Sequence, residues 1–274
     1  MRPPVNPPPS RGFTLLEVII VIAVMAILAA AVTPVLLQRL IDAKIEATRT
    51  EVKALAEAIG GRAEQPGSFG FVGDMGRMPT SFQELVRPDQ APVFSTVTFR
   101  AVGMGWKGPY VTFGETPTDY LTDAFGNAYQ GAASGQIRSA GPDGVYGNGD
   151  DIVYPAAPPV YRGRVVVTLK RMADEGLFYT IDPPLYEVRL YYSKHGQQAY
   201  LSAPMPPFVF ENVPQGLHAI AVIRVRREQM VYQDTIQTFG GGSTKLVEIV
   251  FRLGTFAPIP EGPVQPGVPG GPGL

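Results

Sequence analysis

The sequence of 274 residues contains no cysteine, a single tryptophan and only two histidines. The lack of cysteine excludes disulfide bonds, thiolate zinc sites and cysteine nucleophiles. The two histidines, His195 and His218, lie in strand-like sequence, and no H-E-x-x-H, G-x-S-x-G or P-loop pattern is present. Because no nucleophile and base can be paired from these residues, we do not expect an enzyme.

Charged residues are scarce as well, at 17% of the chain, and 23 basic and 24 acidic side chains leave a net charge of −1. Proteins that hold nucleic acid by its phosphates need clustered Lys and Arg, so we expect no nucleic-acid partner. Glycine and proline, in contrast, are abundant, with 31 and 28 residues. Since both residues disfavour helices, a long stretch without them indicates a helix.

Such a stretch runs from residue 13 to residue 38, where Pro34 is the only breaker and residues 18–38 carry no charge. At a rise of 1.5 Å per residue, the uncharged part forms a helix about 30 Å long, which matches the hydrocarbon core of a bilayer. We therefore predict one transmembrane helix over residues 13–38. Proline removes a backbone hydrogen bond and clashes with the preceding turn, so we expect Pro34 to kink or locally melt this helix.

The residues before this helix include Arg2 and Arg11 and no acid. The positive-inside rule then places the amino end in the cytoplasm and exports the rest of the chain. The alternative is an ordinary cleaved signal peptide, for which residues 29–31, three alanines, would serve as the cleavage site. Glu17 argues against this alternative, because a charge near the bilayer centre costs about 2.5–3.5 kcal/mol and a plain signal has no use for it.

Residues 11–18 read RGFTLLEV and precede a long apolar helix. This segment resembles the class III signal of type IV pilins and type II secretion pseudopilins. The resemblance implies that prepilin peptidase removes residues 1–12 as a leader by cutting between Gly12 and Phe13, methylates the new terminus of Phe13 and leaves the helix in place. It also implies that Glu17 pairs with the Phe13 amine of a neighbouring subunit in a filament, because a buried carboxylate needs a cationic partner.

The helical pattern continues beyond the transmembrane segment as an amphipathic half over residues 39–61. Its apolar positions recur at intervals of three and four, and charged residues lie mostly off that stripe. We expect this half to pack on a globular domain and to end at the pair Gly60 and Gly61. The alternative is a membrane anchor followed by an unrelated coiled coil. The apolar positions are Ile41, Ile45, Thr48, Val52, Leu55 and Ile59.

Residues 62–155 are expected to form a globular domain with a short helix over residues 81–86. Three segments of this domain, in their order and spacing, look like those of the major pseudopilin of type II secretion. The chain departs from that family at Ala124 and Phe125, where proline and tryptophan are usual. The three segments are residues 106–111 (WKGPYV), 123–130 (DAFGNAYQ) and 139–152 (SAGPDGVYGNGDDI).

The last of these segments holds three carboxylates and four glycines within residues 139–151. Carboxylate and carbonyl oxygens are the ligands that Ca²⁺ prefers, and the candidates are Asp143, Asp150 and Asp151. An EF-hand is excluded, because its spacing and its closing glutamate are missing. The alternative is a solvated turn rich in Asn, Asp and Gly. The family resemblance favours calcium and implies that the ion holds the loop in place without a catalytic role.

Residues 156–159 (AAPP) predict a linker, and beyond it the apolar residues alternate with period two over residues 160–256. Short alternating strands separated by Gly and Pro are typical of a β-sandwich. The tail, residues 257–274, has six prolines and five glycines, too little apolar surface to offset the entropy of ordering, so we expect it to be disordered. The predicted strands are residues 164–171, 186–192, 208–213, 218–226, 231–239 and 245–253.

Residues 208–222 (FVFENVPQGLHAIAV) are similar to a hairpin of carboxypeptidase-regulatory-like, transthyretin-like domains, with His218 in place of the usual tyrosine. The resemblance implies a module for presentation or stability without an activity of its own. The predicted fold class is therefore α+β. A long amino-terminal transmembrane helix carries a pilin-like α/β head, and an all-β sandwich follows.

These features together predict a structural filament subunit, a pseudopilin of a type II secretion or type IV pilus-like system. Its expected partners are further copies of itself, other pilin-like subunits, the peptidase and an inner-membrane assembly platform. We expect a single pass through the inner membrane, with the globular part in the periplasm or outside, and a filament after assembly. The alternative is a surface-adhesion or ligand-binding module on a pilin anchor, with a stacking face supplied by Tyr191, Tyr192, Tyr200 and Tyr232.

Overall fold

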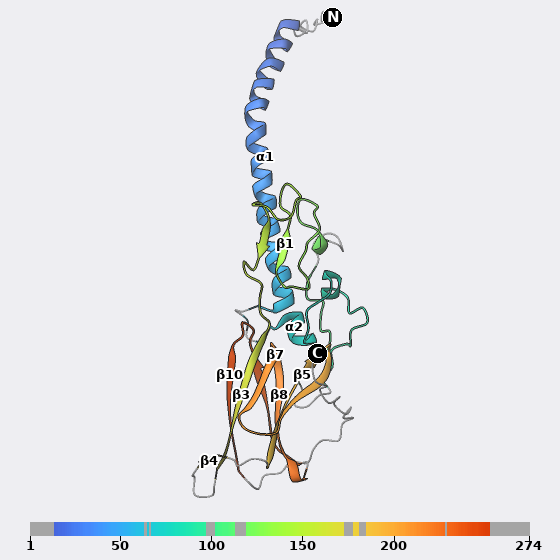
Figure 1. Ribbon diagram of the computed structural model, residues 1–274. Helices are drawn as coiled ribbons and strands as arrows, with labels where there is room; N and C mark the ends of the chain where they lie inside the picture. The colour runs from blue at the N-terminus through green and yellow to red at the C-terminus, as the bar shows by residue number, and fades with distance from the viewer. Residues whose placement is uncertain are drawn as a thin grey trace, which may run out of the picture. The chain divides into compact units, whose positions relative to one another are not determined.

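The computed structural model describes residues 14–62, 65, 67–96, 102–112, 119–172, 178–180, 185–227 and 229–252 (Figure 1). The predicted leader with Gly12 and Phe13 and the predicted tail lie outside these residues. Two compact units make up the chain, Met1–Ala47 and Thr48–Leu274. A long apolar helix and a region of several antiparallel sheets confirm the α+β fold class with a β-sandwich.

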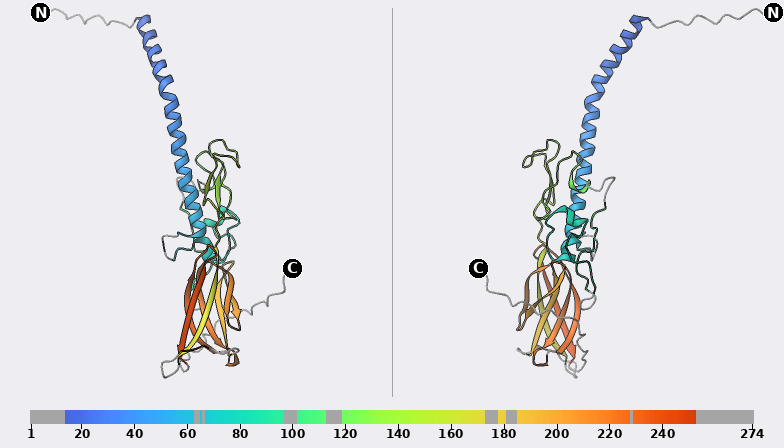
Figure 2. Two further views of the ribbon diagram at one scale, coloured as in Figure 1. Left: turned by 60° about the vertical axis from the view of Figure 1, so that its left-hand side comes forward. Right: turned by 90° about the vertical axis from the view of Figure 1, so that its right-hand side faces the viewer.

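Helix α1 spans Leu15–Gly60 and ends at the predicted glycine. It remains a continuous helix across Pro34, and the Thr33 hydroxyl just before the proline donates to the carbonyl of Ala29 at 2.7 Å. Figure 2 shows that the helix curves gently without a break, so the predicted local melting at Pro34 is absent. Within the described part of the chain, α1 is the one helix long and apolar enough to cross a membrane, and its apolar window has no buried residue.

The carboxy-terminal turns of α1 pack into the head. Val52 and Ile59 are fully buried, and Leu55 is 2% exposed. The spacing of these residues places them on one face of the helix, as the amphipathic pattern predicts. They share a core with residues from the short elements of the head. These are α2 (Gly70–Met75), η1 (Phe82–Leu85), η3 (Asp119–Leu121), β1 (Ile137–Ser139) and β2 (Ile152–Tyr154).

The predicted short helix at residues 81–86 is present as the 3₁₀ helix η1. Helix α2 was not predicted, because its sequence GFVGDM contains two glycines and lacks a capping side chain. It stops at Gly76, which has φ +67°, and a Cβ atom there would lie 1.7 Å from the carbonyl oxygen of Ser193 in the sandwich. Only glycine fits this turn and this close approach together.

Two four-stranded sheets form the sandwich. In one sheet the order is β6-β5-β8-β9, all antiparallel, and in the other β10-β3-β4 with β7 also paired to β3. All six predicted strands are present, and β4 and β6 are additional. The strands are β3 (Arg162–Met172), β4 (Phe178–Thr180), β5 (Tyr186–Lys194), β6 (Gln197–Ala203), β7 (Phe208–Pro214), β8 (Gly216–Arg224), β9 (Gln229–Thr238) and β10 (Thr244–Arg252); η4 (Val225–Arg227) links β8 to β9.

The core of the sandwich lies between the two sheets, since both sheets contribute alternate residues to one buried cluster. Strand β10 pairs in parallel with β3, in register from Thr244 opposite Arg164 to Arg252 opposite Met172. Cluster members from one sheet are Val165, Val167, Leu169, Phe208, Phe210, Val213 and Ile249, and from the other Tyr186, Val188, Leu190, Ala203, Ile220, Val222 and Ile236.

The head and the sandwich meet at the turn between β7 and β8. Gln215 in this turn is 6% exposed, and its amide Nε2 donates to the carbonyl of Gly60 at 2.5 Å and to that of Phe69 at 3.2 Å. Its backbone N–H donates to the carbonyl of Tyr161 at 2.9 Å. The sandwich therefore supplies a hydrogen bond that the last turn of α1 cannot make for itself.

His218 lies in the core of the sandwich and is 1% exposed. Its Nε2 is 2.8 Å from the Pro214 carbonyl and 2.7 Å from the Thr238 hydroxyl, while its buried Nδ1 has no partner. Burial lowers the pKa of His218 from 6.5 to about 4. A protonated ring would also place an Nδ1–H where the described residues offer no acceptor, so the folded state holds a neutral imidazole.

Removal of the Gln215 side chain should destabilise the Thr48–Leu274 unit. Gln215→Ala leaves two buried carbonyl groups without this donor, and we expect a loss of roughly 2–4 kcal/mol. The measurement is urea unfolding of a fragment that begins near Glu46, with Gln198→Ala, an exposed glutamine of β6, as the matched control. Equal stability of the two variants would show that the junction contributes nothing.

The buried imidazole predicts a loss of stability in acid. Folding lowers the pKa of His218 below its ordinary value of 6.5. The folded state therefore has its full stability above pH 6.5 and loses stability as the pH falls toward 4. Between about pH 7 and about pH 5 we expect a loss of about 2 kcal/mol. The free energy of unfolding, measured across this pH range, should fall in the parent fragment and in His195→Gln but not in His218→Gln. The same fall with pH in His218→Gln would contradict the assignment to His218.

Candidate functional site

The first turn of α1 carries a single acid within apolar surface. Thr14 precedes the helix, and its hydroxyl oxygen accepts a hydrogen bond from the backbone N–H of Glu17 at 3.3 Å. This is half of a capping box, T-x-x-E, a sequence signal that our sequence analysis did not use. Glu17 itself is exposed, and its neighbours Leu15 and Leu16 are 79% and 67% exposed. The acid lies in the first turn of the helix, where the helix dipole favours a negative charge.

Apolar exposure continues along the same helix. Large apolar side chains from Leu15 to Leu40 are all at least 46% exposed. An apolar surface of this length does not face water, so lipid or other protein chains must cover it. Its members are Leu15, Leu16, Val18, Ile19, Ile20, Val21, Ile22, Val24, Met25, Ile27, Leu28, Val32, Val35, Leu36, Leu37 and Leu40.

The loop between β1 and β2, residues 139–151, is called the acidic loop below. Its base is held by Asp123, which is 5% exposed and accepts hydrogen bonds from the backbone of Phe125 at 2.9 Å and from the Ser139 hydroxyl at 2.5 Å. The backbone N–H of Asn127 also donates to Asp123 at 2.8 Å, and its side-chain amide donates to the carbonyl of Gly141 at 2.9 Å. The sequence analysis named Asp123 only as part of a family segment and missed this role.

Two hydrogen bonds attach the same region to α1. The backbone N–H of Ala124 donates to the Thr48 hydroxyl at 3.3 Å, and the hydroxyl of Tyr129 donates to Glu51 at 2.5 Å. Burial and the Glu51 carboxylate raise the pKa of Tyr129, so its hydroxyl keeps its proton and remains a donor. The acidic loop is therefore anchored beside the Thr48–Glu51 turn of the helix.

The three predicted calcium ligands lie in the acidic loop but face different partners. Asp143 accepts hydrogen bonds from the backbone of Val145 at 2.8 Å and from the Asn148 amide at 2.6 Å. Asp150 accepts the backbone N–H of Asp143 at 3.2 Å. Asp151 accepts the backbone N–H of Gly147 at 2.8 Å and lies 3.5 Å from the guanidinium of Arg138.

Within the described residues, no group of three or more acidic or histidine side chains is arranged to hold a metal ion. The structure therefore does not bring Asp143, Asp150 and Asp151 together at one point. One observation still suits a cation: the side chain of Asp151 is 7% exposed, and its Oδ1 is buried without a hydrogen-bond partner. The loop supplies oxygen donors, as Ca²⁺ requires, and calcium binding stays a prediction.

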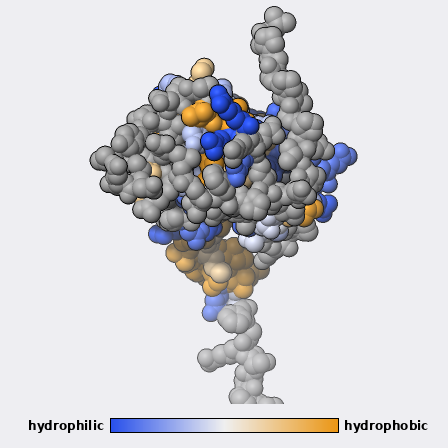
Figure 3. All heavy atoms as spheres, turned by 90° about the horizontal axis from the view of Figure 1, so that it is seen from below, coloured by the Kyte–Doolittle hydropathy of each residue, from blue (hydrophilic) through white to orange (hydrophobic). Residues whose placement is uncertain are grey.

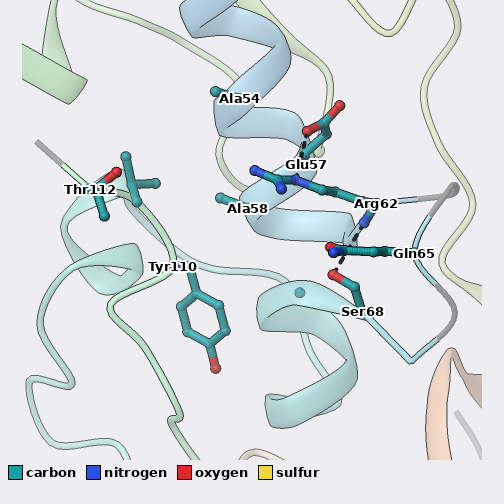
Figure 4. Close-up of a pocket in the computed structure, with 10 residues that line it drawn as sticks. Ala54, Glu57, Ala58, Arg62, Gln65, Ser68, Tyr110 and Thr112 are labelled. Carbon is teal, nitrogen blue, oxygen red and sulfur yellow. Dashed lines mark hydrogen bonds and ion pairs between the residues drawn. The ribbon is translucent and has the colours of Figure 1, made fainter.

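A hollow of about 310 Å³ lies beside the end of α1 (Figure 4). Glu57 lies between two cations at its edge, 3.2 Å from Arg62 and 3.8 Å from Lys53. Figure 4 shows the Arg62 side chain extending across the helix beside Glu57. We call this hollow, together with Lys53, the basic groove. Its lining residues are Ala54, Glu57, Ala58, Arg62, Gln65, Ser68, Gly70, Tyr110, Val111 and Thr112.

The four tyrosines proposed as a stacking face of the sandwich do not share one face. Tyr191 and Tyr200 pair across β5 and β6, with ring centroids 5.6 Å apart. Tyr192 points to the opposite side of β5 from Tyr191, and Tyr232 packs against the sandwich core. On the visible end of the sandwich, Figure 3 shows hydrophilic and hydrophobic residues interspersed. The described residues therefore form no shared aromatic face that would support the alternative of a ligand-binding module.

Comparison with known proteins supports the reading of the amino terminus. Residues 8–33 match the prokaryotic N-terminal methylation motif. The chain carries a prepilin-type signal. This signal covers the predicted cleavage site, Glu17 and the first half of the apolar segment of α1. No curated protein matches the chain.

Among solved structures, a protein of Pseudomonas aeruginosa described as a candidate carbohydrate-binding protein matches at 13% identity. The match covers 35% of this chain and 93% of that chain, with a TM-score of 0.21. A likeness at this level supports no conclusion on fold or function.

Proposed function

We propose that this protein is a structural filament subunit, a pseudopilin of a type II secretion or type IV pilus-like system. The observation that carries the proposal is the prepilin-type signal continuous with α1, whose exposed apolar surface holds a single acid in its first turn. Prepilin peptidase processes such a signal, and the processed chain assembles with pilin-like subunits. Before assembly the subunit is a single-pass inner-membrane protein, with its globular part in the periplasm or outside.

Assembly on an inner-membrane platform moves the apolar helix from lipid into a bundle of identical helices. In both environments the exposed apolar side chains of α1 remain covered, so the transfer costs little hydrophobic free energy. Glu17 changes this balance, because its carboxylate is costly in an apolar environment unless a cation lies beside it. The terminal amine of Phe13 in the neighbouring copy is the proposed cation, and this pairing sets the register between subunits.

We expect Glu17→Ala to separate processing from assembly. The variant keeps the cleavage site, so mass spectrometry of the mature chain should still find N-methylated Phe13. Electron microscopy of the sheared fraction should show few or no filaments, because the pairing carboxylate is missing. Asp42→Ala, which removes an exposed acid further along α1, should assemble normally. Filaments in normal amount from Glu17→Ala would refute the pairing, and a mature chain that starts at Val32 would establish ordinary signal cleavage.

We further propose that calcium binds the acidic loop with Asp151 as its innermost ligand, because Asp151 Oδ1 is buried and unpartnered. Calcium would bind the buried carboxylate of Asp151, which lies beside Arg138. Calcium should therefore raise the melting temperature of the fragment that begins near Glu46. Asp151→Asn should abolish the response, whereas Asp89→Asn, at an exposed site, should keep it. The absence of any shift between calcium and chelator in the parent fragment would contradict the site.

A further inference from the structure

Among the described residues of the basic groove, two cations, Lys53 and Arg62, face one acid, Glu57. Glu57 is 27% exposed and balances one of its two cations, while Lys53 and Arg62 are 58% and 63% exposed. The hollow beside them is lined by small or polar side chains, among them Ala54 and Thr112. A protruding acidic segment therefore fits this place better than an apolar one.

The acidic loop offers that segment. Asp151 pairs with Arg138, but the hydrogen bonds that Asp143 and Asp150 accept come from uncharged donors, which leave their negative charges in place. Asp143 is exposed, and a Cβ atom added at Gly147 or Gly149 would meet no atom within 4 Å. The loop therefore extends as a negative surface with open space around its tip.

The two surfaces lie at different heights along α1. The acidic loop is anchored at Thr48 and Glu51, and the basic groove is centred on Glu57 and Ala58. About eight residues of helix separate these levels, which corresponds to about 12 Å. A contact between two different surfaces of identical subunits is heterologous, and an axial offset turns such a contact into an open helical stack instead of a closed ring.

We propose that the basic groove of one subunit receives the acidic loop of the next copy, with Lys53 and Arg62 facing Asp143 and Asp150. The inference rests on the proposed filament function and names the surface through which the heads touch. The apolar helices supply most of the association, and this contact fixes the rotation and rise between neighbours. Because both surfaces are exposed, the contact weakens as the salt concentration rises.

The absence of cysteine from the chain allows a direct test. Val145→Cys places a thiol on the acidic loop, where Val145 is 58% exposed, and Thr112→Cys places one in the basic groove. Full-length filaments carrying both changes are treated with a mild oxidant in a buffer containing chelator, so that the loop keeps its full charge. We expect a ladder of disulfide-linked multimers on a non-reducing gel.

The controls are each single variant and the pair of Val145→Cys with Lys194→Cys, which lies at the end of β5 in the sandwich. Arg62→Glu added to the cysteine pair should reduce the ladder several-fold. Adding Asp143→Lys and Asp150→Lys to the Arg62→Glu variant should restore the ladder. Lys194→Glu added to the cysteine pair should leave the ladder unchanged. Filaments that assemble without cross-links above the single-variant level overturn the contact alone. Absence of filaments from the unsubstituted chain contradicts the proposed function and the contact together.

Discussion

One carboxylate in the first turn of α1, followed by an uncharged apolar stretch over residues 18–38, is the constraint on which the molecule depends. Glu17 is too costly for a passive anchor and too specific in position for a plain export signal. The capping bond from its own N–H to Thr14 holds it in the helix, so the charge stays at a fixed height on the apolar surface. A fixed charge of this kind discriminates between correct and shifted neighbours, which uniform apolar contacts cannot do.

The junction of head and sandwich is a second constraint, because both belong to one compact unit, Thr48–Leu274. Three kinds of contact join them: the amide of Gln215 to two carbonyls, the hydroxyl of Ser193 to the Asp74 carbonyl at 2.7 Å, and the close approach at Gly76. The bonds of Gln215 and Ser193 give buried backbone carbonyls a partner, as an interior requires. The sandwich is therefore joined to the end of α1, and its orientation is fixed by the head.

The sequence predicted the elements whose physics is local. A 26-residue apolar run without glycine, a helical stripe ending at Gly60 and strands of period two all depend on neighbours in sequence. The prediction missed α2, β4 and β6. Tertiary packing stabilises α2 despite its glycines, and pairing with β3 and β5 stabilises β4 and β6. It also grouped Asp143, Asp150 and Asp151 from the composition of the loop and a family resemblance. In the structure, Asp143 is bonded within the loop, whereas Asp151 pairs with Arg138 in β1.

The hairpin turn from Pro214 to His218 shows how one short segment serves two packing tasks. The Pro214 carbonyl accepts from Thr238 and lies beside the His218 ring inside the sandwich, while the next residue, Gln215, turns outward to the head. A tyrosine in place of His218 would need room for a larger ring at a site that is 1% exposed. Imidazole fits that space and bonds the turn from within, so His218 also holds the turn from which Gln215 reaches α1.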